Sequence, residues 1–315
     1  MPPILPDGFR VGHWSDPGGC TGCTGVRAPP DTVAAGEVRG GGPGTRESDL
    51  LSPASNAPGV QAVCFAGGSA FGLAAADGVQ GWLDERGIGY PTPAGLVPLV
   101  AGAIVYDLAL GDARARPVAQ SGRAACDAAT SEPERGSVGA GTGATVGKVL
   151  GASGITKGGV GLASDAVGGA TVAALAVVNS IGEVVGEDGG VLAGPWRDGG
   201  WVRTVDALKE GVEPPPAVRE ATTLVCVMTD AKLTKRETWL VARAATAGVG
   251  RAIQPSATAW DGDLVYCLAS GRVEVHPFAI SALAADMAAA AIRDGVRSAT
   301  ALGGCPSAAD RAALS

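Results

Sequence analysis

Residues 214–229 read PPPAVREATTLVCVMT, and this stretch decides how the chain is organised. Its first part is rich in proline, which favours a stiff, extended connector. Residues 222–229 form an uninterrupted run of β-branched and apolar side chains, a pattern typical of a buried β-strand. The sequence therefore predicts that an exposed connector ends, and a buried strand begins, between Ala221 and Thr222.

The stretches after this strand alternate between helix and strand patterns. Thr234 and Glu237 fit a capping box at the start of an amphipathic helix that reaches about Ile253. A strand is predicted at 263–269 and a helix of small residues at 279–293. Such alternation is typical of an α/β layered fold.

The part of the chain before residue 222 is predicted to contain further strands and a further helix. Buried strands are predicted at 61–66 and 171–178, and a helix at 70–86 with Ser69 as its cap. Residues 186–219 are rich in glycine and proline and contain few apolar runs, so we expect an exposed, mobile segment there.

Composition and charge exclude several classes of protein. The net charge is −7 and no basic stripe occurs, so a nucleic-acid partner is not expected. The longest nearly uncharged apolar stretch, residues 94–106, contains Pro98 and falls short of the roughly 20 residues that a membrane span needs. No signal-peptide pattern is visible at the start of the sequence. We expect a cytoplasmic protein without a membrane partner.

No motif predicts a cofactor or a metal. The seven cysteines are scattered, and the Cys20 and Cys23 pair has no second pair or histidine cluster to complete a zinc site. Residues 139–144 match a dinucleotide-binding glycine pattern, but a charged run rather than a strand precedes them. We therefore expect neither a cofactor nor a metal.

Thr222 is a candidate nucleophile because of its position at the start of the strand. A threonine hydroxyl attacks poorly unless a base lies beside it, and the α-amine of an N-terminal threonine can be that base. Such an amine has an ordinary pKa near 7.7–8.0, close to working pH. This chemistry requires the chain to break after Ala221.

Several segments, taken together and in order, resemble the family of L-aminopeptidase/D-amidase-esterases, which includes the β-peptidyl aminopeptidases and the nylon-oligomer hydrolases. The similar segments cover most of the chain and occur in the family's order. They are Val11–His13, Arg39–Glu47, Ala66–Leu73, Val105–Asp107, Gly147–Lys148, Ala176–Asn179, Thr222–Leu224 and Asp261–Asp263.

The resemblance implies that the precursor cleaves itself between Ala221 and Thr222, which makes Thr222 the catalytic nucleophile. It places Lys148 near that residue, where it would orient the hydroxyl or tune the amine. Many relatives have Asn before the cleaved bond, whereas this chain has Ala221. Because the side chain before the bond is not the attacking group, alanine need not prevent cleavage.

The same resemblance implies roles for four more side chains. Asn179 matches a donor to the oxyanion, and Tyr106 matches a tyrosine beside it. Asp261 and Asp263 match an acidic pair that supports the nucleophile, and their charge favours a substrate ammonium group. Hydrogen-bond donors held in position before the reaction stabilise the transition state by roughly 3–4 kcal/mol in other enzymes.

For the fold, the resemblance implies an αββα-type sandwich of the N-terminal-nucleophile type, with two central sheets between helices. Residues 1–315 would form one hydrolase domain, processed into a large chain, 1–221, and a small chain, 222–315, that stay together. A homo-oligomer of such pairs, a tetramer, is also implied.

The function predicted from sequence is hydrolysis of short peptides, amino-acid amides or esters, or aminohexanoate oligomers through an acyl-enzyme. Whether the enzyme is exo- or endo-acting stays open. One alternative is an acyltransferase similar to the ornithine acetyltransferases, which also cut before threonine and have a downstream Thr-Asp-Ala, here Thr229–Ala231. Another is an unprocessed homologue that binds a small molecule without catalysis.

Overall fold

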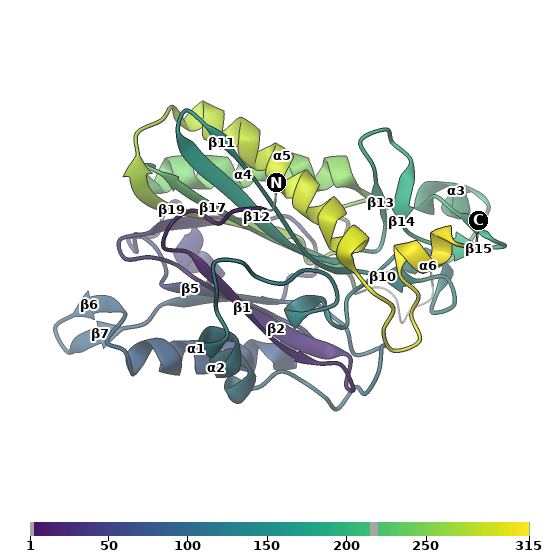
Figure 1. The fold of residues 1–315 in the computed structure, drawn as a ribbon, viewed down its shortest axis with the longest axis horizontal. Helices are drawn as coiled ribbons and strands as arrows, with labels where there is room; N and C mark the ends of the chain where they lie inside the picture. Colours follow the sequence, from purple (N-terminus) through teal and green to yellow (C-terminus); the bar gives the residue numbers. More distant parts are fainter. Residues whose placement is uncertain (1–2, 215–219, 315) are drawn as a thin grey trace.

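The structure, a computed structural model, describes residues 3–214 and 220–314. It has four layers: two five-stranded sheets lie face to face, and a pair of helices covers the outer side of each (Figure 1). The strands of the first sheet are, in spatial order, β1 (Arg10–Asp16), β2 (Thr21–Arg27), β5 (Ala62–Ala66), β8 (Val100–Ile104) and β4 (Thr45–Arg46).

The second sheet carries the strand that the sequence singled out. Its strands are, in spatial order, β11 (Gly159–Val167), β12 (Ala170–Asn179), β17 (Thr222–Ala231), β19 (Leu264–Val273) and β3 (Val33–Val38). The central strand, β17, runs antiparallel to β12 and parallel to β19. Strands from before and after Ala221 are therefore interleaved in one sheet.

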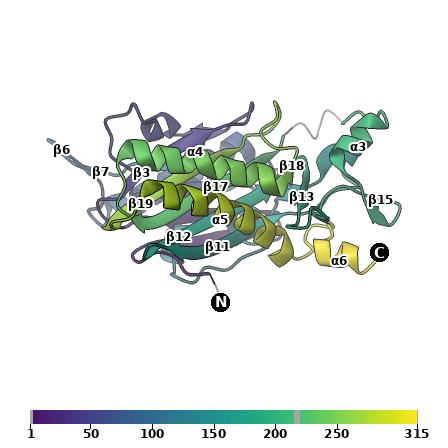
Figure 2. The ribbon, with the colours of Figure 1, turned by 90° about the horizontal axis from the view of Figure 1, so that it is seen from above.

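Three apolar clusters fill the spaces between the four layers. Helices α4 (Lys235–Ala252) and α5 (Pro277–Ser298) cover the second sheet, where their small residues allow close packing (Figure 2). Helices α1 (Ala75–Asp84) and α2 (Ala119–Asp127) cover the first sheet. The third cluster, which includes Phe65 and Tyr266, lies between the two sheets. The predicted αββα sandwich is confirmed.

Glycine makes the closest of these contacts possible. A Cβ atom added to Gly161 of β11 would lie 2.0 Å from the carbonyl oxygen of Ala291 in α5. Likewise, a Cβ on Gly78 of α1 would lie 1.7 Å from the carbonyl oxygen of Ala119 in α2. Helices can approach a sheet or each other this closely only where a residue has no side chain.

Smaller elements surround the sandwich. They are η1 (Ser48–Leu51), β6 (Tyr90–Thr92), β7 (Gly95–Val97), η3 (Gly139–Gly141), β9 (Thr145–Val146), η4 (Lys148–Leu150), β10 (Thr156–Lys157), β13 (Glu183–Val185), β18 (Ile253–Gln254) and α6 (Ala308–Ala312). In residues 3–214 and 220–314, no helix combines the length and the apolar character that crossing a membrane would require.

The segment predicted to be exposed and mobile is instead largely ordered. It contains β14 (Val191–Ala193), β15 (Trp196–Arg197), β16 (Gly200–Trp201) and α3 (Thr204–Lys209). The rings of Trp196 and Trp201 pack edge to face with centroids 4.7 Å apart, and Thr204 donates from both its N–H and its hydroxyl to buried Glu183. The rest of the prediction concerns residues 215–219, with Pro215 and Pro216, which lie outside the described residues.

The helix predicted at 70–86 begins differently from the expectation. A 3₁₀ turn, η2 (Ser69–Ala74), comes first, and the α-helix starts at Ala75. Gly68 and Ser69 both have positive φ, 79° and 53°, so Ser69 lies inside the turn and does not cap it. By contrast, the capping box of Thr234 and Glu237 forms as predicted.

Candidate active site

The register of the second sheet brings the predicted site residues to one edge. Asn179, the last residue of β12, lies directly opposite Thr222, the first residue of β17. On the other side of β17, Ala221 forms an isolated parallel bridge with Asp261, just before β19. Neighbouring strands thus place the threonine, the asparagine and the acidic loop together, although they are far apart in the sequence.

The Thr222 hydroxyl lies against the bond that it is predicted to attack. Its Oγ1 donates to the carbonyl oxygen of Ala221 at 2.5 Å, and the residue is almost completely buried. The backbone N–H of Gly262 donates to the same carbonyl oxygen at 2.8 Å, and the N–H of Ala221 donates to the Trp260 carbonyl at 3.2 Å. Ala221 is therefore held through both its N–H and its carbonyl oxygen.

Lys148 is buried beside this peptide. Its Nζ donates to the carbonyl oxygens of Asn179 at 2.9 Å and Glu220 at 3.1 Å. Asn179 lies opposite Thr222 on the neighbouring strand, and Glu220 lies two residues before Thr222 in the chain. Burial lowers the pKa of Lys148 to about 7, against the opposing effect of nearby Asp261. Near neutral pH the amine can therefore exist without its proton.

The acidic pair holds the start of β17 through backbone groups. Asp263 accepts the N–H of Thr223 at 2.6 Å through one oxygen and the N–H of Ala257 at 2.8 Å through the other. Asp261 accepts the N–H of Thr258 at 2.8 Å. Burial raises the pKa of both carboxyls, and the adjacent Asp261 helps to raise that of Asp263 to about 7.

The glycine-rich turn after β3 fastens the acidic loop from outside. Gly40 donates its N–H to the Asp263 carbonyl at 3.1 Å, and Gly42 donates to the Asp261 carbonyl at 2.9 Å. A Cβ on Gly40 would lie 2.0 Å from the Asp261 carbonyl oxygen. Only glycine allows the two backbones to come this close, which explains why the sequence has glycine here.

Asn179 contacts the backbone of Tyr106. Asn179 donates from Nδ2 to the Tyr106 carbonyl at 3.2 Å and accepts the N–H of Thr145 at 3.0 Å. In the uncut chain the Ala221 carbonyl has Gly262 as its backbone donor. The side-chain amide of Asn179 is thus engaged by the backbone of Tyr106 and of Thr145 in β9, and its role as a donor to the oxyanion stays a prediction.

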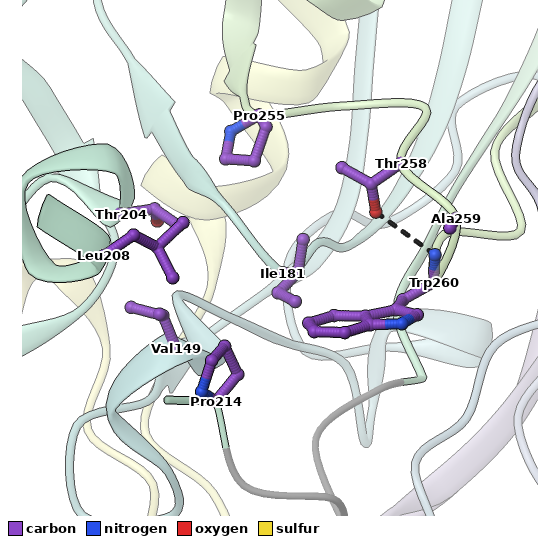
Figure 3. A pocket seen from close by; sticks show the side chains of 9 residues that line it. All are labelled: Val149, Ile181, Thr204, Leu208, Pro214, Pro255, Thr258, Ala259 and Trp260. Atoms are coloured by element: carbon purple, nitrogen blue, oxygen red, sulfur yellow. Dashed lines mark hydrogen bonds between the residues drawn. The ribbon is translucent and has the colours of Figure 1, made fainter. Parts of the chain in front are cut away.

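Three cavities meet at this site. One of about 330 Å³ is lined by Thr222, Ala221, Tyr106 and Trp260. A second, of about 290 Å³, lies around Lys148 and shares Tyr106 with the first. The third, of about 240 Å³ and mostly apolar, shares Trp260 with the first; the indole of Trp260 forms one of its walls (Figure 3). A small molecule therefore has room beside Thr222 in the first cavity, and the other two cavities adjoin that one.

The sequence profile of peptidase family S58 matches residues 7–306. The chain belongs to peptidase family S58. An uncharacterized aminopeptidase of Mycobacterium leprae is 43% identical over 291 residues, which cover 85% of this chain and 78% of that protein. A 6-aminohexanoate-oligomer endohydrolase of a Kocuria species is 29% identical, with 89% of this chain and 81% of that protein covered.

Solved structures agree with the S58 assignment at the level of the fold. A β-aminopeptidase of a Burkholderia species superposes with a TM-score of 0.74 at 20% identity, over all of this chain and 93% of that one. The L-aminopeptidase D-Ala-esterase/amidase of Ochrobactrum anthropi, described as a variant of the Ntn-hydrolase fold, gives 0.72 at 20% identity, over 99% and 91%. The predicted family, its N-terminal-nucleophile fold and an amide-bond hydrolase are thereby confirmed.

Some residues of this S58 site were missed in the sequence. Gly262 and Trp260 act through backbone atoms, which leave no side-chain signal. Asp107 accepts the N–H of Gly68 at 2.6 Å and the hydroxyl of Thr21 at 2.7 Å, and so fixes the turn whose Ser69 and Ala70 line the cavity beside Thr222. In the described part of the chain, no group of three or more His, Cys, Asp or Glu side chains is arranged to hold a metal.

Proposed function

We propose that this S58 chain cleaves itself between Ala221 and Thr222, and that the freed Thr222 is the nucleophile of an amide hydrolase. One observation carries the proposal: the Thr222 hydroxyl lies 2.5 Å from the Ala221 carbonyl oxygen while the Gly262 N–H holds that same oxygen. This arrangement supports the proposal, because it would bring the attacking group and a donor for the developing negative charge to the same carbonyl.

Self-cleavage proceeds in two steps. The Thr222 oxygen attacks the Ala221 carbonyl carbon, its proton passes to a base, and the Gly262 N–H stabilises the oxyanion. The carbon–nitrogen bond then breaks as the Thr222 nitrogen gains a proton, which leaves an ester between Ala221 and the threonine oxygen. Water hydrolyses this ester, which yields a carboxylate on Ala221 and restores the Thr222 hydroxyl beside the free amine.

Turnover uses the same oxygen with the new amine as base. The amine takes the hydroxyl proton, the oxygen attacks a substrate amide, and an acyl-enzyme forms as the substrate amine leaves. Asn179 donates to the oxyanion with Tyr106 beside it, and Asp261 and Asp263 keep the start of β17 in position. Water then releases the acid.

The two products of cleavage remain one folded domain in this proposal. Chain 222–315 contributes β17 and β19, and chain 1–221 contributes the strands on both sides of them, β12 and β3. Separating the chains would break the centre of the sheet and expose its core, so they stay together. A tetramer of such pairs in the cytoplasm, with no nucleic-acid partner, is part of the proposal.

For the substrate we propose short peptides, amino-acid amides or esters, or aminohexanoate oligomers. The described walls of the cavity beside Thr222 include Gly42, Gly44, Ala70 and Ala259, whose small size leaves room for an acyl group. The names of the Mycobacterium and Kocuria relatives include an aminopeptidase and an oligomer endohydrolase, which supports amide substrates of both kinds.

Replacing Gly262 with alanine tests the proposed geometry of cleavage. The added Cβ would lie 2.7 Å from the Thr222 Oγ1, so the hydroxyl must move away from the carbonyl. Because a displacement of about 1 Å can cost about 100-fold in rate, we expect Gly262→Ala to slow self-cleavage by that factor. Appearance of the two chains after synthesis in a cell-free system measures the rate.

Gly81→Ala is the matched control for this variant. Gly81 lies in α1, and a Cβ there would meet nothing within 4 Å. This variant should cleave at the rate of the unaltered chain. Equal rates for Gly262→Ala and Gly81→Ala would show that the position of the Thr222 hydroxyl does not limit cleavage, against the proposal.

A further inference from the structure

Lys157 is a buried cation whose ammonium group is bonded to three backbone carbonyls. It is the last residue of β10, and its side chain is completely buried. Its Nζ donates to the carbonyl oxygens of Ala144 at 2.7 Å, Gly141 at 3.1 Å and Gly158 at 3.1 Å. Burial lowers its pKa to about 8, so at neutral pH the ammonium keeps the three protons that these bonds need. Burying this charge costs free energy that an apolar side chain of the same length would not cost.

The peptide between Ala144 and Thr145 links Lys157 to the candidate oxyanion donor. Its carbonyl oxygen accepts from the Lys157 Nζ at 2.7 Å and from the N–H of Gly158 at 2.9 Å. Its N–H, which belongs to Thr145, donates to the Oδ1 atom of Asn179 at 3.0 Å. Because a peptide group is planar and rigid, fixing its carbonyl also fixes the direction of its N–H.

The hydrogen bonds of the Asn179 amide determine which way its two ends point. The oxygen faces the Thr145 N–H, and the nitrogen donates to the Tyr106 carbonyl at 3.2 Å. An amide nitrogen has two N–H donors, so a second one is left for the oxyanion of a substrate. If the amide turned over, its oxygen would lie where its nitrogen lies now and would repel the developing negative charge.

We infer that Lys157 is a positioning residue for turnover: it fixes the 144–145 peptide and, through that peptide, the orientation of the Asn179 amide. This rests on the proposed function, in which Asn179 donates to the oxyanion. In the described structure, Lys157 is not among the residues that line the three cavities of the site, so it acts without touching substrate. Its charge also polarises the peptide, which makes the Thr145 N–H a stronger donor to Asn179.

Self-cleavage has a different donor for its oxyanion. In the uncut chain, the Gly262 N–H donates to the Ala221 carbonyl at 2.8 Å. Loss of the Lys157 ammonium should therefore slow turnover far more than it slows self-cleavage. A lysine with a purely structural role would affect both reactions when it is replaced.

Lys157→Met tests this inference, because it keeps the length of the side chain and removes the ammonium. Kinetics are measured on cleaved protein with the p-nitroanilides of alanine and of N-acetyl-alanine, using the one that the unaltered protein hydrolyses faster. We expect kcat to fall about 10- to 100-fold with little change in KM, because a displaced donor loses most of its effect on the transition state. In protein that already carries Asn179→Ala, the same substitution should change kcat less than about twofold.

Thr156→Val is the matched control. Thr156 precedes Lys157 in β10, is equally buried, and donates to the Gly194 carbonyl at 2.8 Å instead of to the 144–145 peptide. The control thus loses a buried hydrogen bond of the same strand and should keep its kcat. If Lys157→Met does not fold, Lys157→Gln replaces it, since the glutamine amide retains two N–H donors.

The outcomes separate this inference from the proposed function. The inference is overturned, and a Thr222 hydrolase left intact, by an unchanged kcat in Lys157→Met or by an equal loss with and without Asn179. It is also overturned by an equal loss in Thr156→Val, by an equal slowing of self-cleavage, or by failure of both Lys157 variants to fold. An unchanged kcat in Asn179→Ala would overturn the role of Asn179 in the proposed function. If the cleaved, unaltered protein hydrolyses no amide or ester, the proposed function itself is overturned.

Discussion

Thr222→Ala should yield a single uncut chain with no hydrolase activity. The substitution removes the oxygen that lies 2.5 Å from the Ala221 carbonyl, and no other hydroxyl donates to that carbonyl in the described chain. Without the attack, neither the ester nor the free amine can form. Intact-mass spectrometry of the purified variant, followed by assays on the p-nitroanilides of alanine and of N-acetyl-alanine, measures both losses.

Two variants control for effects on folding. Thr223→Val changes the adjacent buried threonine to a residue of similar shape and keeps the Thr223 N–H that binds Asp263, so it should still cleave. Thr222→Ser keeps the hydroxyl and should cleave at the same bond. A fragment that begins at residue 222 in Thr222→Ala would show that another group cuts the chain.

The rate of self-cleavage should rise with pH through about 7 and depend on Lys148. Burial lowers the pKa of Lys148 to about 7, so the fraction of neutral amine increases as pH rises past that value, and only the neutral amine can accept the Thr222 proton. Arginine stays charged in its place. We expect Lys148→Arg to slow cleavage by about 10²–10⁴ and to remove the inflection near pH 7.

A second buried lysine provides the comparison. Lys157 also has a pKa lowered by burial, to about 8, but its Nζ donates to the carbonyls of Gly141, Ala144 and Gly158 instead of the scissile segment. Lys157→Met should keep the pH profile of cleavage, whereas Lys148→Met should lose it. If Lys148→Arg cleaves as fast as the unaltered chain, Lys148 acts as a donor and not as the base.

Much of the fold was predictable because the local spacing of apolar residues matches the face that each element buries. The strand at 222–229 and the helix after Thr234 form as their sequences indicate, since each buries the face that its apolar spacing creates. The predictions that differ depend on distant contacts. Thr204 starts α3 by bonding to Glu183, and a run of glycines gives no local sign of that partner.

The candidate site was predictable only where side chains carry the signal. Motifs similar to the family singled out Thr222, Lys148 and Asn179. The strand register places Thr222 opposite Asn179, and Lys148 donates to the Asn179 carbonyl. The Gly262 N–H and the Trp260 carbonyl escaped prediction because any residue has these groups. Their position depends on how β17 pairs with β19, which only the folded sheet determines.

N-terminal sequencing of the purified, unaltered protein tests the central claim most directly. The account predicts two chains from the 30.9 kDa precursor, about 22 and 9 kDa in proportion to residues 1–221 and 222–315. The smaller chain should begin Thr-Thr-Leu-Val-Cys, from Thr222. A single uncut chain, or a new terminus at any other residue, would contradict Thr222 as a self-generated nucleophile.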